Sequence, residues 1–211
     1  MATAADVIWT RHVGRVFKAT RRTAAHIEWT IAELAKAHPA ARLSIIQTCY
    51  NTGVSASAGT HDFDAVLDVQ IVGLDWFTAQ GWLRAHGWAA WVRQPPTFSW
   101  HIHMVSLGYP GRVGVFVPGQ VADYYNNRTG LAGHAADNTW HPADIDSTIF
   151  DYPAWLRDQE DEMTPKQEEA IDKRFDAIEN QIGDLRDFIN DRVRQPSFKR
   201  ESRIWDKLRG K

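Results

Sequence analysis

Hydrophobic residues recur at two different spacings in the first half of the chain, and each spacing predicts one kind of element. Between residues 23 and 38 they fall three and four positions apart, which predicts an amphipathic helix that ends before a proline. A second helix is predicted to begin after Asp75, a suitable N-cap, and to end near Ala85, with Gly87 as C-cap. Runs rich in β-branched and aromatic residues predict strands at 43–49, 64–72, 88–92 and 98–107. This mixture of elements is typical of an α+β fold.

Regular patterns are weaker at the N-terminus and after residue 107. Residues 7–9 and 113–117 predict two short strands, but scattered Gly, Pro and Asn indicate that most of 108–155 is loop. His134, Asp137 and His141 lie in this segment. Their loose spacing argues against a second metal site, and they are expected to lie on the surface.

The pattern changes again after residue 155. Residues 156–163 are acidic and predict a solvated linker between a domain at 1–155 and a helix at 164–195. In that helix the apolar residues follow a four-three spacing, which predicts a short coiled coil and therefore a homo-oligomer. The alternative is a single helix packed against the first domain. Residues 196–211 form a basic tail.

Composition excludes several classes of protein. A formal net charge of -2 gives no basis for general nucleic-acid binding. No apolar run is long enough to cross a membrane, and the N-terminus lacks the pattern of a secretion signal, so synthesis in the cytoplasm is expected. The single cysteine, Cys49, excludes an internal disulfide and is expected to be a buried thiol. The ten Trp indicate dense packing or a surface that binds carbohydrate or peptide.

Polar residues interrupt two of the predicted strands. In the second strand, alternation places Asp68 among apolar neighbours, where a buried carboxylate needs a cation as its partner. In the fourth, His101 and His103 project side by side from one face. His61 lies just before the second strand. Two imidazoles and a carboxylate that leave one position open are typical ligands of a catalytic zinc ion, whereas Arg93 is the alternative partner for the carboxylate.

The order and spacing of these residues resemble those of the zinc D-Ala-D-Ala peptidases and of the related hedgehog signalling domain. In that family zinc is bound by a histidine, an aspartate seven positions later and a histidine near the end of the domain. The matching positions here are His61, Asp68 and His103. The His-Ile-His stretch is similar to the context of the last ligand. The resemblance covers about residues 20–110, and it implies an antiparallel sheet flanked by helices.

The resemblance also implies roles for neighbouring residues. His101, beside the last ligand, would steady a developing oxyanion or relay a proton. The family has a substrate-binding serine two positions before the first ligand, where this chain has Gly59. Ser57, Thr60 and Asn51, in the same loop region, are therefore the candidates for binding substrate.

The catalytic base is where the chain departs from the family. Many members carry a glutamate shortly before the last ligand, but this chain has no glutamate between Glu33 and Glu160. A carboxylate base would then be an aspartate, and Asp64 and Asp62 are the nearest in sequence to a ligand. Otherwise His101 would take the role.

Three hypotheses for function follow. The first is a zinc-dependent peptidase that cleaves peptidoglycan stem peptides, of the D-Ala-D-Ala carboxypeptidase or endopeptidase type; the cell-wall substrate comes from the resemblance. A wall enzyme without a secretion signal indicates a bacteriophage or actinobacterial protein, for example a phage lysin or a virion component. The second is a non-catalytic binding or assembly protein with structural zinc and a coiled coil for oligomerisation. The third is an α+β domain without metal.

Overall fold

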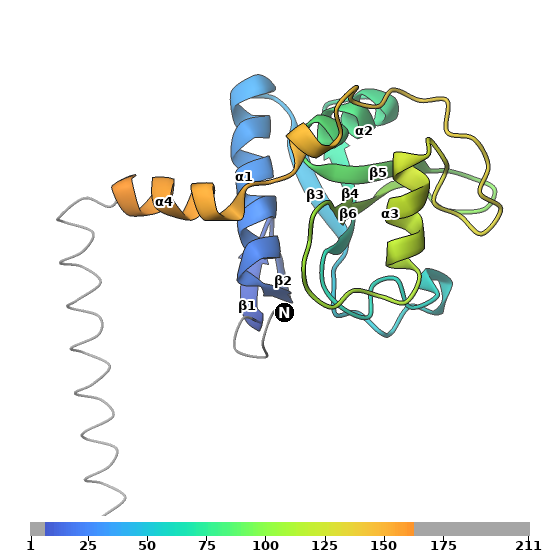
Figure 1. Cartoon of the computed structure of the whole chain (residues 1–211), viewed down its shortest axis with the longest axis horizontal. Coiled ribbons are helices and arrows are strands. Elements are labelled where there is room, and N and C mark those ends of the chain that lie inside the picture. The colour runs from blue at the N-terminus through green and yellow to red at the C-terminus, as the bar shows by residue number, and fades with distance from the viewer. Residues whose placement is uncertain (1–6, 163–211) are drawn as a thin grey trace, which may run out of the picture. The chain divides into compact units, whose positions relative to one another are not determined.

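The computed structural model describes residues 7–162, which contain a four-stranded antiparallel sheet, a separate hairpin and four helices (Figure 1). The strand order in the sheet is β3-β4-β6-β5. Its strands are β3 (Arg42–Gln47), β4 (Val66–Val72), β5 (Trp88–Arg93) and β6 (His101–Ser106). All neighbouring strands are antiparallel, which confirms the predicted α+β class and the antiparallel sheet.

Local sequence accounts for the hairpin and the first two helices. The hairpin pairs β1 (Val7–His12) with β2 (Arg15–Thr20) through a two-residue turn in which both φ angles are positive, as in the turns that suit twisted hairpins. Helix α1 (Arg21–Ala37) begins at Thr20, whose side chain accepts a hydrogen bond from the backbone of Thr23. Helix α2 (Trp76–Ala85) begins at Asp75, whose carboxylate accepts two backbone hydrogen bonds. The predicted N-cap is thus confirmed.

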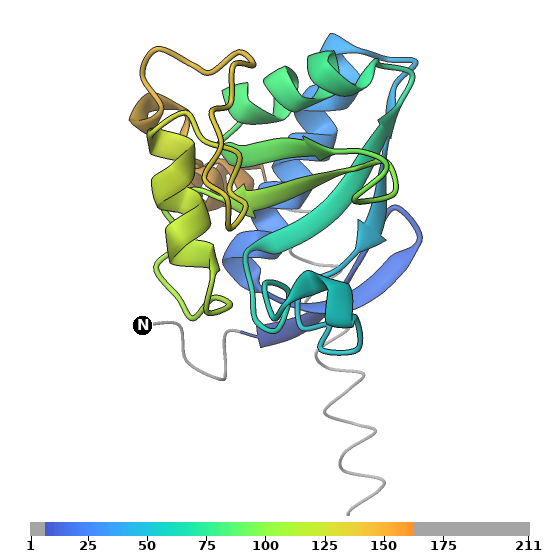
Figure 2. The same ribbon diagram turned by 90° about the vertical axis from the view of Figure 1, so that its right-hand side faces the viewer.

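Alternation along the strands separates two hydrophobic clusters, one on each face of the sheet. On one face, Leu67 and Met104 belong to a cluster that includes Ile27 of α1 and Leu83 of α2. On the other face, residues of β4, β5 and β6 pack with Val117 and Tyr124 of α3 (Val117–Tyr125): Val66, Ala89, Trp91 and Val105. Figures 1 and 2 show α1 and α3 on opposite sides of the sheet.

The structure corrects one predicted strand and leaves the C-terminal predictions untested. Residues 113–116 are not a strand, and Val117 begins α3, because Pro118 in the first turn favours a helix start. The final helix of the described part is α4 (Tyr152–Glu162), so the predicted linker is helical as far as Glu162. The predicted coiled coil at 164–195 and the basic tail lie outside the described residues. No helix within residues 7–162 is long and apolar enough to cross a membrane.

Candidate metal centre

Three segments bring His61, Asp68 and His103 together on the face of the sheet that α3 covers. Asp68 in β4 and His103 in β6 are paired directly across the two strands, so their side chains leave the same face. His61 comes from the irregular segment before β4. A backbone hydrogen bond of 2.9 Å from the Asn51 N–H to the His61 carbonyl holds this segment in place. His61, seven residues before Asp68 in the sequence, is therefore held beside Asp68 of β4.

The potential ligand atoms converge on one carboxylate oxygen. His61 Nε2 lies 3.3 Å from Asp68 Oδ1, and His103 Nδ1 lies 2.8 Å from the same oxygen. One ligand atom from each residue lies within 4.8 Å of the others, and all three residues are buried. Within residues 7–162 this is the only such group of three metal-ligating side chains.

The far nitrogen of each imidazole faces an oxygen that can only accept a hydrogen bond. His61 Nδ1 lies 3.2 Å from the carbonyl oxygen of Thr48, so Nδ1 carries the hydrogen and donates it. The Gln120 amide donates through Nε2 to the Gly130 carbonyl at 3.2 Å, which turns its Oε1 toward His103. His103 Nε2 donates to that Oε1 at 3.2 Å. In the neutral rings, each remaining nitrogen therefore directs a lone pair at Asp68.

Two lone pairs and an anionic oxygen that face one another need a cation between them. Burial raises the pKa of the Asp68 carboxyl, but His103 and His61, which hydrogen-bond to it when their facing nitrogens carry a hydrogen, outweigh burial and hold this pKa well below its usual value. Burial lowers the pKa of His103, although Asp68 acts in the opposite direction. The lowered pKa favours the neutral ring. A single metal ion would satisfy all three groups without placing protons on both rings.

The donor set fits a divalent transition metal such as zinc. Zinc binds imidazole nitrogen and carboxylate oxygen, and ligating histidines usually donate their other N–H to a carbonyl or carboxylate. Thr48 and Gln120 supply those acceptors here. The residues thus form a buried group that could hold a metal ion, although two nitrogens and one oxygen suit several metals.

A cavity of about 740 Å³ gives access to the group from the α3 side of the sheet. Its lining includes the three candidate ligands, His101 and two of the predicted substrate-binding residues, Ser57 and Thr60. His101 Nδ1 donates to the Ser99 carbonyl at 2.8 Å, so in the neutral ring Nε2 is left as an acceptor. This nitrogen lies 3.8 Å from Asp68 Oδ2, and it is the one suited to take a proton.

The remaining predicted site residues do not line the cavity. The side chain of Asn51 accepts a hydrogen bond from the Gly53 N–H at 3.2 Å, within a local turn. Asp64 is fully buried, and its Oδ2 accepts hydrogen bonds of 3.0 Å from the Thr20 N–H and the Thr23 hydroxyl. The Asp64 carboxylate therefore joins the start of α1 to the segment before β4.

The histidines and aspartate after α3 differ from the expectation of surface residues. His134 is exposed and pairs with Asp123 at 2.8 Å, but the side chains of Asp137 and His141 are buried. Asp137 pairs with Arg84 at 2.5 Å rather than with a metal ligand. The surface prediction is therefore wrong for two of the three, because long-range polar contacts draw them against α2.

The sequence does not indicate the place of two residues that line the cavity, Gln120 and Arg93. Gln120 lies on α3, a helix that the hydrophobic pattern did not predict, so nothing indicated that it would meet His103. The sequence suggests Arg93 only as a partner of Asp68, yet no ion pair joins these two among the described residues. Strand alternation could have indicated the position of Arg93, because it places Trp91 and Arg93 on the same face of β5.

Comparison with known proteins adds no family assignment. No protein-family model, no curated protein and no solved structure gives a significant match to the chain. The metal centre therefore rests on the geometry of its own residues.

Proposed function

We propose that the protein is a zinc-dependent peptidase that acts on peptidoglycan stem peptides, of the D-Ala-D-Ala carboxypeptidase or endopeptidase type. The observation that carries the proposal is the convergence of two imidazole lone pairs and the Asp68 carboxylate beside a cavity. The seven-residue spacing and the His-Ile-His stretch support the choice of peptidase through their resemblance to the zinc D-Ala-D-Ala peptidases and the hedgehog-like fold.

Each residue of the cavity has a role in this proposal. His61, Asp68 and His103 hold the zinc ion, which when bound supplies Lewis acidity toward a carbonyl oxygen. His101 accepts a proton through Nε2, the nitrogen that its bond to Ser99 leaves free. Ser57 and Thr60, which also line the cavity, contact the peptide.

One observation favours a second candidate, a non-catalytic binding or assembly protein. Among the described residues that line the cavity, Asp68 is the only one with a carboxylate, and it is a candidate ligand. The cavity therefore lacks a carboxylate base. In this second proposal zinc ties β4, β6 and the segment of His61 together, and residues 164–195 attach the domain to a larger particle such as a phage virion.

The first test is the metal content of the purified protein by elemental mass spectrometry. We expect about one zinc ion per chain, lost in His61→Ala and in His103→Ala because each removes one of only three protein ligands. His38→Ala is the matched control, since His38 does not line the cavity. Wild-type protein without zinc after loading and dialysis would contradict both proposals.

The second test separates the enzyme from the assembly protein. Zinc-loaded protein is incubated with purified sacculi and with diacetyl-Lys-D-Ala-D-Ala, and released products are followed by liquid chromatography. We expect cleavage by the wild type and a loss of about 100-fold or more in His101→Ala with zinc content unchanged. No cleavage of either substrate by fully loaded wild type would leave only the assembly proposal.

A further inference from the structure

Arg93 is a buried cation that faces the candidate metal centre's cavity. It is the last residue of β5 and is paired directly with His101 of β6, just as Trp91 is paired with His103. Alternation therefore places Arg93 on the cavity face of the sheet, one row away from the candidate ligands. It is 6% exposed and is the only Arg or Lys among the described residues that line the cavity.

The Arg93 guanidinium has few polar partners for a buried charge. Its Nη1 donates to the Thr129 carbonyl at 2.9 Å, and its other contacts are with the rings of Trp91 and Phe98 at 5.5 and 5.9 Å. No carboxylate among residues 7–162 lies within ion-pair distance of it. A guanidinium carries five N–H donors, so most of its donors have no acceptor within the described part of the chain.

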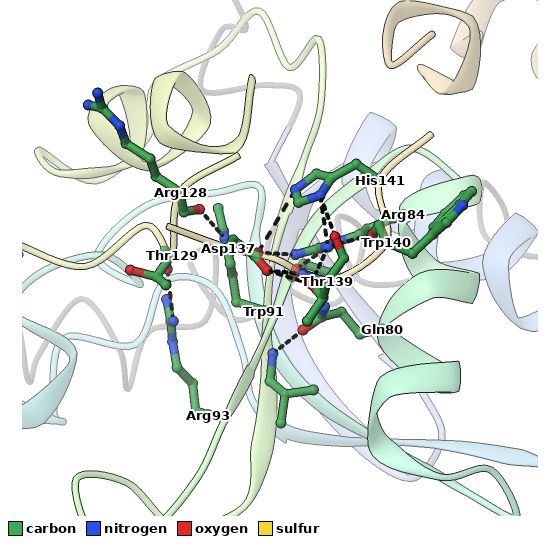
Figure 3. Close-up of polar contacts among 12 residues, drawn as sticks. Gln80, Arg84, Trp91, Arg93, Arg128, Thr129, Asp137, Thr139, Trp140 and His141 are labelled. Atoms are coloured by element: carbon green, nitrogen blue, oxygen red, sulfur yellow. Dashed lines mark hydrogen bonds and ion pairs between the residues drawn. The ribbon is translucent and has the colours of Figure 1, made fainter. Parts of the chain in front are cut away.

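Arg84 shows how the same fold satisfies a buried guanidinium when the charge is structural. Its nitrogens donate to the carbonyls of Ala90 and Trp140, to the Thr139 hydroxyl and to the Asp137 carboxylate. Figure 3 shows this saturated network next to the single hydrogen bond of Arg93. Arg84 does not line the cavity, whereas Arg93 does.

We propose that Arg93 binds the terminal carboxylate of a peptide ligand in the cavity, beside the metal centre. The proposal rests on the proposed function and deepens it, because it selects a peptide with a free C-terminus and hence carboxypeptidase over endopeptidase specificity. A buried cation is stabilised by an anion, and the planar fork of Arg matches the two oxygens of a carboxylate.

Distance and surroundings fit a terminal residue. Arg93 lies opposite His101, two residues from His103, or about 7 Å along β6. One peptide residue spans about 3.5 Å, so a carboxylate at Arg93 leaves the bond before the last residue within reach of the candidate ligands. Phe98, Leu131 and Ala132 line the same cavity and suit a small apolar side chain on that residue.

The charge of Arg93 is retained under ordinary conditions. Burial lowers the pKa of its guanidinium to about 10, with Asp68 and Asp137 acting against this shift at longer range. The side chain is therefore positively charged at neutral pH, as binding of a carboxylate requires.

The test compares the binding of three peptides to the full chain by isothermal titration calorimetry, with zinc-loaded and with EDTA-treated protein. The peptides are diacetyl-Lys-D-Ala-D-Ala as free acid, the same peptide as its C-terminal amide, and an amidated peptide with a Glu side chain as its only carboxylate. We expect the free acid to bind at least 10-fold more tightly than either amide. This comparison needs no variant, so it does not depend on the folding of a mutant.

Two variants then assign the preference to Arg93. In Arg93→Gln the advantage of the free acid is expected to vanish with metal content unchanged, whereas Arg93→Lys is expected to restore part of it because the charge is kept. Arg112→Gln is the matched control, since Arg112 is exposed and does not line the cavity.

The outcomes keep the two proposals apart. A preference for the free acid that depends on Arg93, in a wild-type protein that takes up no zinc even after loading, would sustain the carboxylate site and overturn the peptidase. Equal affinity for acid and amide, equal affinity for the Glu peptide, or no binding of any peptide would overturn the carboxylate site, whatever the zinc content.

Discussion

Gln120 decides which nitrogen of His103 is available to a metal. Its amide is fixed by the bond to the Gly130 carbonyl, so its oxygen must accept from His103 Nε2 and Nδ1 is left facing Asp68. This oxygen orients a candidate ligand without itself belonging to the group of three. A partner of this kind acts on affinity by fixing the orientation of the ring.

The Gln120 arrangement predicts the effect of one substitution. In Gln120→Ala we expect zinc affinity to fall about 10- to 100-fold, because the ring loses the acceptor that holds it in the binding tautomer. Competition with a chromophoric chelator measures the affinity, and Gln94→Ala, at an exposed position, is the control. An affinity equal to that of the wild type would remove Gln120 from the centre.

His26 of α1 is a second histidine whose ring is fixed at both nitrogens. It lies on the other face of the sheet, the one that α1 covers. Its ring stacks between Trp88 and Phe150 at centroid distances of 3.9 and 4.7 Å. Its nitrogens bond to the Ser106 hydroxyl and the His86 carbonyl, both at 2.8 Å. Burial lowers the pKa of His26 to about 3, so the folded protein holds the ring neutral.

This depressed pKa predicts that acid destabilises the fold. Below pH 6.5 the unfolded chain gains a proton on His26 that the folded protein does not take, so the free energy of unfolding falls by about 1.4 kcal/mol per pH unit down to about pH 3. Urea unfolding at pH 7 and pH 5 measures the change. We expect a smaller change in His26→Gln, and an identical one would contradict the assignment.

At the scale of elements, buried polar contacts hold the segment that follows α3 against α2 and β5. The Arg84 side chain, fully buried, bonds to Asp137, and Trp91 Nε1 donates to the Arg128 carbonyl at 2.9 Å (Figure 3). The same segment contributes Leu131 and Ala132 to the cavity, and Figure 2 shows it beside the sheet. The wall of the cavity is thus fixed by contacts with α2 and β5 that do not involve the candidate ligands themselves.

Removing one partner of the Arg84 pair should therefore be costly. In Asp137→Ala we expect the free energy of unfolding to fall by about 3–5 kcal/mol, because a buried guanidinium loses its counter-ion. Urea unfolding measures this loss, with Asp158→Ala at an exposed position as control. The double variant Arg84→Met/Asp137→Ala is expected to recover part of the loss, and a double variant that is less stable than Asp137→Ala would contradict the explanation.

The sequence predicts elements where one local rule dominates. The period of α1, the N-cap of α2 and the alternation in β4 and β6 are each written in adjacent residues, and Asp68 and His103 could be placed from them. The position of the segment that follows α3 could not be predicted in this way. Arg84 and Asp137 lie 53 positions apart, and their contact depends on the finished sheet. The contacts of Asp64 and Gln120 could not be predicted for the same reason, because the partners of each residue lie on another segment of the chain.

At the scale of the whole molecule, an ion bound by His61, Asp68 and His103 would join parts of the chain that separate on unfolding. His61 precedes β4, and Asp68 and His103 lie on two neighbouring strands. An ion that binds only the folded protein raises the free energy of unfolding. The gain grows with the logarithm of the ratio between the free ion concentration and Kd.

Zinc should thus raise the stability of the protein in a concentration-dependent way. At free zinc about 1,000 times Kd the expected gain in the free energy of unfolding is about 4 kcal/mol, and EDTA should abolish it. Urea unfolding across a zinc titration measures the gain, which should be absent in His103→Ala. A wild-type protein whose urea unfolding midpoint changes neither with zinc nor with EDTA would contradict this prediction.

The direct pairing of Asp68 with His103 has a consequence for how the chain reaches its native state. If β6 paired with β4 one residue out of step, His101 and His103 would turn toward α1 and Ile102 and Met104 would enter the cavity. Such a chain would have no place for the ion. Metal uptake would then act as a proofreading step, because it rewards only molecules whose two central strands have paired correctly.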